Sequence, residues 1–408
     1  MMNKIPKGWE VKKLKDIGKI SSGGTPSTSN DNNFGGNIAW ITPADLTGYK
    51  DKFISKGKRN LSEAGLKNSS AKILPKGTIL FSSRAPIGYV AIAQNEISTN
   101  QGFKNLTPNE SVISEYVYYY LLGSKNLAEQ SASGTTFKEI SATAFSNLPI
   151  PLPPLSEQKA IADKLDDSFV KIENAITNLI NAKENLKLYK QSVLKSAFNG
   201  DLLPNTSPTH WEVKKLGEIC EKIGDGLHGT PSYNDDGEYF FINGRNISYP
   251  YLIINNNVKR LSSDEALKYK KDFNTHTIFV SINGTLGNIG FYNNEKIILG
   301  KSVCYLNLKD NVNKYYIFFN LKSNEFLNYA NLKATGSTIK NVSLQAMRNF
   351  EIPLPPLSEQ NLIVAEIDRR FAIVDKTLNL IDKSIQNAKN LKQSILKKAF
   401  SGELRSEI

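Results

Sequence analysis

The sequence IPLPPLSEQ, at Ile150–Gln158, occurs a second time without a change at Ile352–Gln360. Both copies end a turn-rich region and begin a segment with helical periodicity. Proline disrupts a helix interior, because it lacks the backbone N–H and its ring clashes with the preceding turn. We therefore expect Pro151–Pro154 to be an extended, stiff lead-in, with Ser156 and Ser358 as the N-caps of two helices.

The whole chain is duplicated around this sequence. The segment WEVKKL at Trp9 returns at Trp211, QSVLKSAFNGDL from Gln191 returns as QSILKKAFSGEL from Gln393, and both matches lie 202 residues apart, as do the two copies of IPLPPLSEQ. So long a period indicates a duplicated unit of domain size rather than a solenoid repeat. Between the matches the copies diverge, which predicts two lobes that share a fold and differ in loops and surface.

The segments after IPLPPLSEQ carry apolar residues spaced three and four apart, the pattern of a coiled-coil seam. The seam residues are Leu165, Phe169, Ile172, Ile176, Leu179 and Leu186 in the first helix, and Ile367, Phe371, Val374, Leu378, Ile381 and Ala388 in the second. Each helix should extend for about 60 Å and stop at Gly200 or Gly402. The connector Asp201–His210 reaches at most about 33 Å. The sequence therefore predicts antiparallel pairing, with one lobe near each end of the rod.

The lobes have short β-like runs bounded by Gly, Pro, Asn and Asp, and a helical run follows in each. The predicted strands are Ile38–Ile41, Thr78–Ser82, Tyr89–Ala93, Ile278–Ile282 and Lys296–Leu299, and the predicted helices are Ser114–Ser124 and Asn313–Asn331. The predicted fold class is α+β: two mixed α/β lobes, each followed by a long helix, with the helices in an antiparallel coiled coil of pseudo-twofold symmetry. The predicted domains are lobe one (1–150), a hinge and helix (151–200), lobe two (201–352) and a second hinge and helix (353–408).

The chain has a net charge of +12, most of it outside the two long helices. A basic balance suits a polyanion such as DNA, although a solubility surface would give the same charge. No apolar run approaches the roughly 20 residues that span a bilayer, and the N-terminus lacks the apolar core of a signal peptide. We expect a cytoplasmic protein with no membrane partner.

The sequence offers little for catalysis. Cys220 and Cys304 are expected to be buried thiols rather than a disulfide, and the three histidines lack metal-ligand spacing. The tripeptide Gly300-Lys301-Ser302 is not a P-loop, because Glu295 stands where the first glycine belongs. We predict no catalytic residue and no metal site.

Taken together, the order of lobe, PLPPLxEQ and helix, given twice, resembles the specificity subunit of Type I restriction–modification systems over essentially the whole chain. Lobe two keeps WEVKKL, GTPS and TGSTIKNVS, but has FINGRNI where lobe one has ITPADL. Lobe one carries GWEVKKL, GGTPS, IAWITPADL (Ile38–Leu46), LPKGTILFSSRAPIG (Leu74–Gly88), NQGF (Asn100–Phe103) and SGTTFKEIS (Ser133–Ser141).

This resemblance implies that each lobe is a target recognition domain that reads one half of a split site in double-stranded DNA. The helices would hold the lobes at fixed spacing and dock two modification subunits, which methylate adenine with S-adenosylmethionine. Restriction subunits with motor and nuclease activity, using ATP and Mg²⁺, would join them. The chain itself would bind none of these cofactors and catalyse nothing.

Candidate DNA contacts lie beside Gly, Pro and Asn at predicted strand ends. Arginine can pair with guanine and asparagine with adenine in the major groove, which favours Arg84, Arg245, Asn243 and Asn246, although ordinary surface residues would look the same. A second set suits a phosphate-binding loop or, equally, a turn that packs on the hinge: Thr135, Thr136 and Lys138 in lobe one, and Ser337, Thr338 and Lys340 in lobe two.

Two functions of other classes stay open at this point. One is an enzyme, a nuclease or methyltransferase, with motifs that are not evident. The other is a structural coiled-coil scaffold with protein-binding lobes. Missing methyltransferase and P-loop motifs count against the first, and two basic lobes count against the second.

Overall fold

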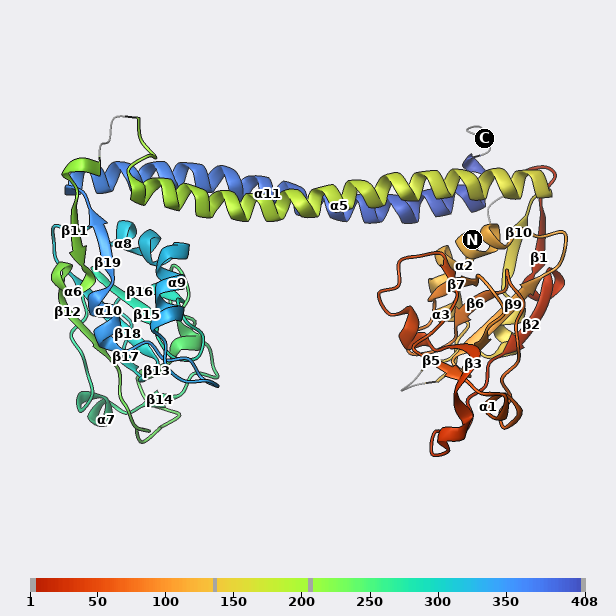
Figure 1. The fold of residues 1–408 in the computed structure, drawn as a ribbon, viewed down its shortest axis with the longest axis horizontal. Helices are drawn as coiled ribbons and strands as arrows, with labels where there is room; N and C mark the ends of the chain where they lie inside the picture. Colours follow the sequence, from red (N-terminus) through yellow and green to blue (C-terminus); the bar gives the residue numbers. More distant parts are fainter. Residues whose placement is uncertain (1–4, 135–137, 205–207, 405–408) are drawn as a thin grey trace. The chain divides into compact units, whose positions relative to one another are not determined.

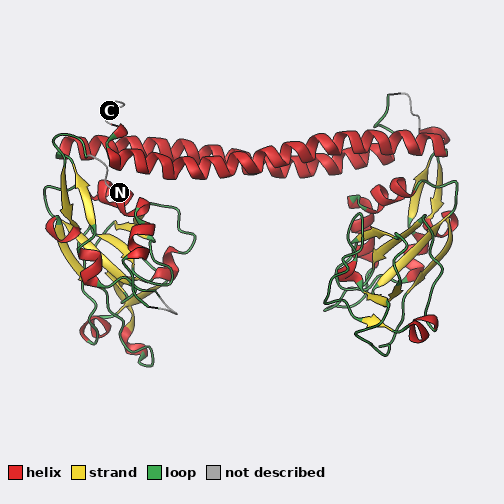
Figure 2. Ribbon diagram, turned by 180° about the vertical axis from the view of Figure 1, so that it is seen from behind, coloured by secondary structure: helices red, strands yellow, loops and turns green. Residues whose placement is uncertain are grey.

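The computed structural model describes residues 5–134, 138–204 and 208–404 (Figures 1 and 2). The chain forms two units, one made of Met1–Leu179 with Lys383–Ile408 and the other of Ile180–Asp382. Unit 1 holds lobe one, the beginning of helix α5 (Leu155–Asn199) and the end of helix α11 (Leu357–Ser401). Unit 2 holds lobe two with the remaining parts of both helices. Each unit is therefore built from segments far apart in the sequence.

The two lobes have matching sheets. In lobe one the large sheet has the order β2 (Gly18–Ser22), β9 (Phe103–Pro108), β6 (Ile79–Ser82), β7 (Val90–Ala93), β4 (Phe53–Ile54), and a second sheet the order β5 (Arg59–Leu61), β3 (Phe34–Ile41), β8 (Ser98–Thr99). In lobe two they are β12 (Cys220–Asp225), β18 (Val303–Leu308), β15 (Thr277–Ser281), β16 (Ile289–Phe291), and β14 (Arg260–Leu261), β13 (Tyr239–Ile242), β17 (Ile297–Leu299). All five predicted strands are present, and the α+β class is confirmed. Within the described residues, lobe two has no counterpart of edge strand β4.

Short helices complete each lobe. Lobe one has α1 (Glu63–Lys67), α2 (Ser114–Gly123), α3 (Lys125–Gln130), α4 (Ala142–Ser146), η1 (Leu14–Asp16), η2 (Asp31–Asn33) and η3 (Pro43–Leu46). Lobe two has α6 (Leu216–Ile219), α7 (Ser263–Leu267), α8 (Lys314–Leu321), α9 (Asn324–Lys333), α10 (Leu344–Asn349), η4 (Pro208–His210) and η5 (Gly244–Asn246). The prediction of one helix over Asn313–Asn331 is wrong, because the helix ends at Leu321 and a second helix, α9, begins at Asn324. The Ser323 hydroxyl caps α9 by accepting a hydrogen bond from Phe326 N.

The two most faithfully repeated segments of the sequence pair with each other. Strand β1 (Glu10–Lys13) runs antiparallel to β10 (Pro149–Leu152), and β11 (Glu212–Lys215) pairs in the same way with β19 (Glu351–Leu354). Both are two-stranded ribbons, so the prolines sit on an edge where no second neighbour needs their missing N–H. The lead-in is extended as predicted, but it is also anchored to the EVKK segment, which periodicity alone did not indicate.

A buried glutamine joins each hinge to its lobe. Gln158 accepts a hydrogen bond from Ile113 N at 2.9 Å and donates to the carbonyls of Pro153 at 2.9 Å and Ser111 at 3.2 Å. Gln360 accepts from Asn313 N at 2.8 Å and donates to Pro355 O at 2.8 Å. Both side chains are only 1% exposed. These contacts of the side-chain amide explain why glutamine stands at the same place in both copies.

Buried tyrosines hold the same hinge strands from the other side. The hydroxyl of Tyr116 donates to Pro151 O at 2.6 Å, and that of Tyr316 donates to Pro353 O at 2.6 Å. The N-cap prediction for Ser156 and Ser358 is wrong: α5 begins at Leu155 and α11 at Leu357, so a proline directly precedes each helix and the serine lies inside its first turn. Proline is tolerated at that place because the N–H groups at a helix start have no partner within the helix, so its missing N–H removes no helical hydrogen bond.

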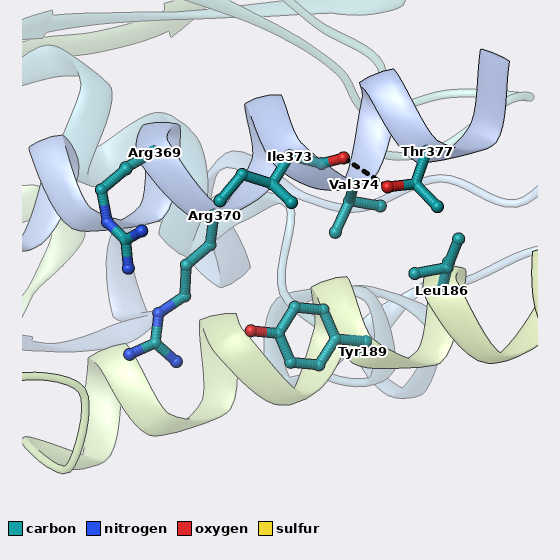
Figure 3. Close-up of a pocket in the computed structure, with 7 residues that line it drawn as sticks. All are labelled: Leu186, Tyr189, Arg369, Arg370, Ile373, Val374 and Thr377. Atoms are coloured by element: carbon teal, nitrogen blue, oxygen red, sulfur yellow. Dashed lines mark hydrogen bonds between the residues drawn. The ribbon is translucent and has the colours of Figure 1, made fainter. Parts of the chain in front are cut away.

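The long helices pack antiparallel within each unit. In unit 2, Lys183 pairs with Asp382 at 2.7 Å and Lys190 with Asp375 at 2.6 Å, so partner numbers fall along α11 as they rise along α5. In unit 1 the end of α11, with Leu396 and Ala399, joins the core of lobe one, and in unit 2 the end of α5 joins that of lobe two. All twelve seam residues are buried or half-buried. Figure 3 shows part of the pair in unit 2.

The helices stop where glycine was expected. α5 ends at Asn199 and α11 at Ser401, and the following Gly200 and Gly402 have φ of +81° and +80°. This left-handed conformation is open to glycine at little cost, which is why it terminates helices.

Candidate nucleic-acid interface

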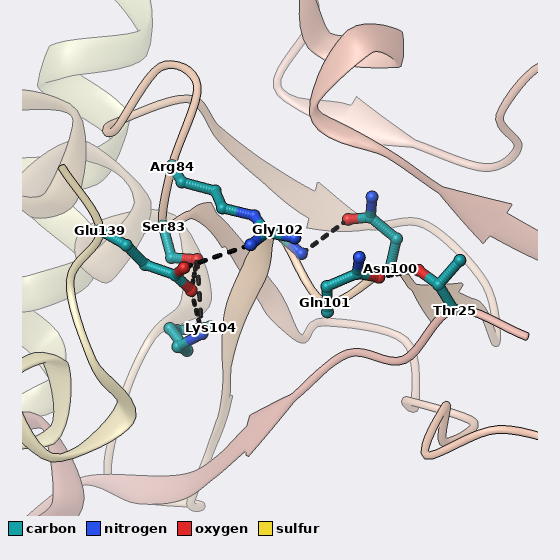
Figure 4. Close-up of polar contacts among 8 residues, drawn as sticks. All are labelled: Thr25, Ser83, Arg84, Asn100, Gln101, Gly102, Lys104 and Glu139. Atoms are coloured by element: carbon teal, nitrogen blue, oxygen red, sulfur yellow. Dashed lines mark hydrogen bonds and ion pairs between the residues drawn. The ribbon is translucent and has the colours of Figure 1, made fainter. Parts of the chain in front are cut away.

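Three segments of lobe one meet in Figure 4: the loop after β6 with Arg84, the turn before β9 with Gln101, and the chain around Glu139. Together with η3, whose Pro43 lies against Gly102, they form what we call the loop cluster. Backbone hydrogen bonds fix them, since Ser83 N donates to Gly102 O at 2.7 Å and Ile140 N donates to Ser83 O at 3.0 Å. Arg84 and Glu139 also form a β-bridge. The side chains of the cluster are therefore presented by a rigid backbone.

Lobe two repeats this backbone. Ile282 N donates to Ser302 O at 3.0 Å, Val342 N donates to Ile282 O at 2.8 Å, and Asn283 and Asn341 form the β-bridge. Residue Asn283 thus occupies the place of Arg84, and Asn341 that of Glu139. The two loop clusters are equivalent positions of one fold, so their side chains can be compared one by one.

Lobe one carries three charges in its cluster. Glu139 accepts from Lys104 at 3.1 Å and from Arg84 at 3.3 Å, while the side chain of Lys104 is only 8% exposed. Burial acts to raise the pKa of Glu139, but the hydrogen bond and charge of Lys104, aided by Arg84, hold that pKa below its ordinary value. A buried ammonium needs such a partner, because an unpaired charge is costly away from water.

Lobe two carries no charge at the same three places. Asn283 donates to Asn341 Oδ1 at 3.1 Å, and the buried thiol of Cys304 lies on β18 where Lys104 lies on β9. Three positions that carry charges in lobe one are thus uncharged in lobe two. Such a difference changes what the surface can bind while leaving the strand frame in place.

The two predicted arginines lie in different lobes and at different places of the loop cluster, Arg84 after β6 in lobe one and Arg245 in η5 of lobe two. Arg245 belongs to η5 and is exposed, and its place in lobe one is taken by Ala44 of η3. The two turns are alike, since Asp45 accepts from Thr42 N at 2.8 Å and Asn246 from Asn243 N at 3.0 Å. This turn fixes FINGRNI as the counterpart of ITPADL.

Asn246, Asn243 and Arg84 differ in how accessible their side chains are to a DNA partner. Asn246 is buried and also donates to Ile253 O at 3.2 Å, so its amide holds the loop. Asn243 is half-buried beside it, and Arg84 is 40% exposed despite its bond to Glu139. Arg84, Asn243 and Arg245 therefore remain candidates, whereas Asn246 is better explained as a structural residue.

The predicted phosphate-binding loops are described in part. Thr135 and Thr136 lie outside the described residues, and Lys138 is exposed beside them. Ser337, Thr338 and Lys340 are all exposed, in a hairpin that closes with two backbone hydrogen bonds between Thr335 and Asn341, at 2.9 and 2.8 Å. The Lys340 ammonium donates to Asn331 Oδ1 at 2.7 Å.

Sequence reasoning missed two exposed residues of the clusters. Gln101 and Lys301 occupy equivalent turns before β9 and β18, and the hydroxyl of Thr25 donates to Gln101. The motif NQGF was a signal for the first. Lys301 lay in the GKS tripeptide, which was rejected as a P-loop because Glu295 stands where the first glycine belongs, and no other motif marked this lysine.

A groove of about 410 Å³ opens on the helix pair of unit 2 (Figure 3). It is lined by Leu186, Tyr189, Arg369, Arg370, Ile373, Val374 and Thr377. Glu366 accepts from both arginines, whose hydrogen bonds lower its pKa to about 2. Ile373 is 56% exposed. Exposed apolar side chains on a rigid helix pair, with fixed charges beside them, suit a protein partner.

The described residues contain no group of three His, Cys, Asp or Glu that could hold a metal ion. Cys220 and Cys304 are free and buried, as predicted, and burial raises the pKa of Cys220 to about 12. His228 pairs with Asp225 at 2.6 Å on the surface. No described helix is both long and apolar enough to cross a membrane.

Comparison with known proteins gives this architecture a family. The family described as "Type I restriction modification DNA specificity domain" matches twice, over residues 6–182 and 208–388. The chain therefore belongs to the Type I restriction–modification DNA specificity family. It is 34% identical to the Type I restriction enzyme MjaIX specificity subunit of Methanocaldococcus jannaschii, over 100% of this chain and 96% of that one. It is 25% identical to the EcoKI specificity subunit of Escherichia coli K12, over 99% and 91%.

Solved structures support the fold. A chain described under "complex assembly and conformational transition of the type I R-M system" matches with a TM-score of 0.73 at 22% identity, over 98% of this chain and 99% of that chain. The HsdS subunit from Thermoanaerobacter tengcongensis matches with a TM-score of 0.61 at 20% identity, over 98% and 99%.

Proposed function

We propose that this chain is the DNA-binding specificity subunit of a Type I restriction–modification enzyme and is not itself catalytic. Each lobe reads one half of a bipartite target in double-stranded DNA. The observation that carries the proposal is a duplicated backbone frame with different side chains at its loop clusters. A protein that read one symmetric site would gain nothing from that difference, whereas two unlike half-sites require it.

The DNA contacts divide by chemistry. Arg84, Asn243 and Arg245 can address base edges, since arginine matches guanine and asparagine matches adenine in the major groove. Lys138, Ser337, Thr338 and Lys340, with Gln101 and Lys301, suit phosphates or bases beside them. Thr135 and Thr136 belong to the same loop by sequence. Lobe one has charged residues at the three positions of Arg84, Lys104 and Glu139, where lobe two has Asn283, Cys304 and Asn341, and this difference supports different half-sites.

The long helices dock the partner subunits in this proposal. Two modification subunits bind there and methylate adenine with S-adenosylmethionine, and restriction subunits that use ATP and Mg²⁺ complete the enzyme. The partner subunits, and not this chain, bind these cofactors. The groove lined by Tyr189 and Ile373 supports a docking role, because exposed apolar residues on a helix pair favour a protein neighbour. We place the assembly in the cytoplasm, where its DNA lies.

The test is reconstitution. The pure chain with S-adenosylmethionine, ATP and Mg²⁺ should transfer no radiolabelled methyl group to DNA, and adding its modification subunits should give methylation at one bipartite sequence. An Arg245→Ala variant should relax the target at one half-site, with Arg260→Ala, an arginine on β14, as the matched control. Methyl transfer by the chain alone would overturn the proposal.

Fixed spacing of the lobes has its own test. Inserting one heptad after Asn181 and another after Lys383 preserves the seam phase and lengthens each helix by about 10.5 Å. At about 3.4 Å per base pair the preferred spacer should grow by about three base pairs. Binding should also weaken, because the second half-site turns by roughly 100°. An unchanged spacer optimum in an active double insertion would mean that the helices do not set the spacing.

A further inference from the structure

A second cleft, of about 620 Å³, lies in unit 2 where lobe two meets the helix pair. Its aromatic wall contains Phe371 and the stacked rings of Tyr249 and Phe318, whose centroids are 4.3 Å apart. Lys190 lies 4.6 Å from the Phe371 centroid and is paired with Asp375. Two more charged residues, Lys322 and Asp368, also line the cleft. Its size, and a lining that combines aromatic rings with a few charged groups, are those of a small-molecule site.

At the equivalent place in unit 1, the carboxylate is paired with a lysine of the same chain. Asp166, the repeat counterpart of Asp368, accepts from the Lys52 ammonium at 2.6 and 2.7 Å and also accepts from the Tyr119 hydroxyl. Lys52 directly precedes β4 and lies 5.5 Å from the Tyr119 ring centroid. The carboxylate of unit 1 is therefore satisfied by a cation enclosed against an aromatic ring.

Unit 2 keeps the carboxylate and loses its partners. Pro250 takes the backbone place of Lys52, since Phe291 N donates to Pro250 O as Ile92 N donates to Lys52 O. Phe319 stands where Tyr119 would donate a hydroxyl. Within the described residues Asp368 has no ion pair and no side-chain hydrogen bond, and burial raises its pKa. Unit 2 therefore presents, in the lining of the cleft, a solvent-accessible carboxylate without the built-in cation that unit 1 has.

Unit 2 also gains an ammonium that unit 1 lacks. Lys322 is the residue that follows α8, and its counterpart in lobe one, Leu122, lies in the last turn of α2. Gln191 holds the backbone there by donating to Lys322 O at 3.3 Å. Among the described residues the Lys322 ammonium has no carboxylate partner, and burial lowers its pKa. The loss of one built-in cation thus coincides with the gain of another charge in the same cleft.

We propose that this cleft binds a small zwitterion of the amino-acid class. Its ammonium or guanidinium group pairs with Asp368, its carboxylate pairs with Lys322, and its body packs on the rings of Phe371 and Phe318. A simple cation would satisfy Asp368 but be repelled by Lys322, and an anion would meet the reverse problem. The inference rests on the cleft of unit 2 and does not depend on the function proposed for the whole chain.

The experiment titrates the purified full chain by calorimetry with L-phenylalanine and L-arginine. Phenethylamine and agmatine, which lack the carboxylate, and 3-phenylpropionate, which lacks the ammonium, are the matched probes. At least one amino acid should bind, and its truncated analogues should bind at least about tenfold more weakly, because each loses a charge-assisted hydrogen bond. Equal affinity for the amine and the amino acid, or no heat with any probe, would overturn the proposal.

Variants locate the site. Asp368→Asn and Lys322→Met should each weaken amino-acid binding at least about tenfold, while Asp166→Asn in unit 1 and Lys376→Met on the exposed face of α11 should leave it within about twofold. Circular dichroism checks that each variant folds. Binding that survives both cleft variants places the ligand elsewhere. Loss of stability in both single variants with no further loss in the double variant would show that Lys322 and Asp368 serve each other, which also overturns the proposal.

Discussion

The loop clusters of the two lobes share a backbone and differ in charge. In lobe one, Glu139 binds Lys104 and Arg84, and in lobe two the same bridge joins Asn341 to Asn283. The hydrogen bonds that fix the loops in both lobes run between backbone atoms. Because backbone hydrogen bonds fix these loops, one lobe could change the side chains of its cluster without changing the course of the loops. The difference between lobes therefore indicates where binding specificity lies.

The largest expected effect comes from removing the difference. Replacing Gly217–Phe350 by residues 15–148 keeps β11, β19 and both long helices, and gives both lobes the charged cluster. The methylated target should become symmetric, with two inverted copies of the lobe-one half-site, because both lobes then read alike. Sequencing of methylated adenines in cells that express the variant with its partner subunits measures this. Methylation at the original asymmetric target would refute the idea that each lobe reads its own half.

A second prediction compares the two hinges, each of which is anchored to its lobe by a buried glutamine. Gln158→Ala leaves Ile113 N and two carbonyls without a partner, and Gln360→Ala leaves Asn313 N and one carbonyl. Each buried group left without a partner costs about 1–3 kcal/mol. At the low end of that range, three groups in unit 1 should lower the free energy of unfolding by about 3 kcal/mol, and two groups in unit 2 by about 2 kcal/mol. Hydrogen exchange of the peptides around each hinge reports the two units separately.

The matched control for the hinge variants is Gln386→Ala, an exposed glutamine of α11 whose side chain donates a hydrogen bond to Asn390, its one side-chain partner among the described residues. It should change stability by less than about 0.5 kcal/mol. If Gln158→Ala had no larger effect than this control, the buried amide would not be what anchors the hinge.

A third prediction tests whether lobe one depends on its charges as a set. Glu139→Asn leaves the buried Lys104 ammonium without its carboxylate and should destabilise lobe one by about 2 kcal/mol, less than for a fully buried pair because Glu139 is 35% exposed. Adding Lys104→Cys copies lobe two at two of the three positions, leaving Arg84, and should recover most of that loss. Denaturant unfolding followed by hydrogen exchange measures both variants. A double variant as unstable as the single one would show that the lobes are not interchangeable here.

The sequence predicted the architecture because its evidence was periodic or repeated. Apolar spacing predicted the long helices, and Gly200 and Gly402 predicted their ends. Ser156 looked like an N-cap, but the preceding proline already fits a helix start, and a one-residue shift of that kind is invisible to a pattern. The role of Gln158 depends on Ile113, far away in sequence, so no local signal could reveal it.

The candidate site was predicted less completely, because its contacts join residues that lie far apart in the sequence. Arg84 and Arg245 were found because each stands beside glycine, proline or asparagine at a strand end. Their partners were not, since Glu139 and Lys104 come together only when β6, β9 and the chain before α4 are folded. Asn246 was selected by residue type, and only the turn it closes with Asn243 shows that its amide is engaged.

The smallest effect we predict is a difference in acid sensitivity between the clusters. The pKa of Glu139 is held below its ordinary value of 4.5 by Lys104 and Arg84, against the effect of burial, so its ionised form stabilises the folded lobe. For a carboxyl with a depressed pKa this stabilisation is present above the ordinary pKa and is lost as pH falls through the folded-state value. Asn341 has no proton to gain. Between about pH 5 and pH 3, protection of the paired amides of Ser133 and Glu139 should therefore fall more than that of Thr335 and Asn341, which make the same two backbone hydrogen bonds. Hydrogen exchange corrected for intrinsic rates compares these matched pairs in one molecule, and Glu139→Gln should remove the difference. An equal fall in both lobes, or a difference that persists in Glu139→Gln, would mean that another group sets the acid response of lobe one.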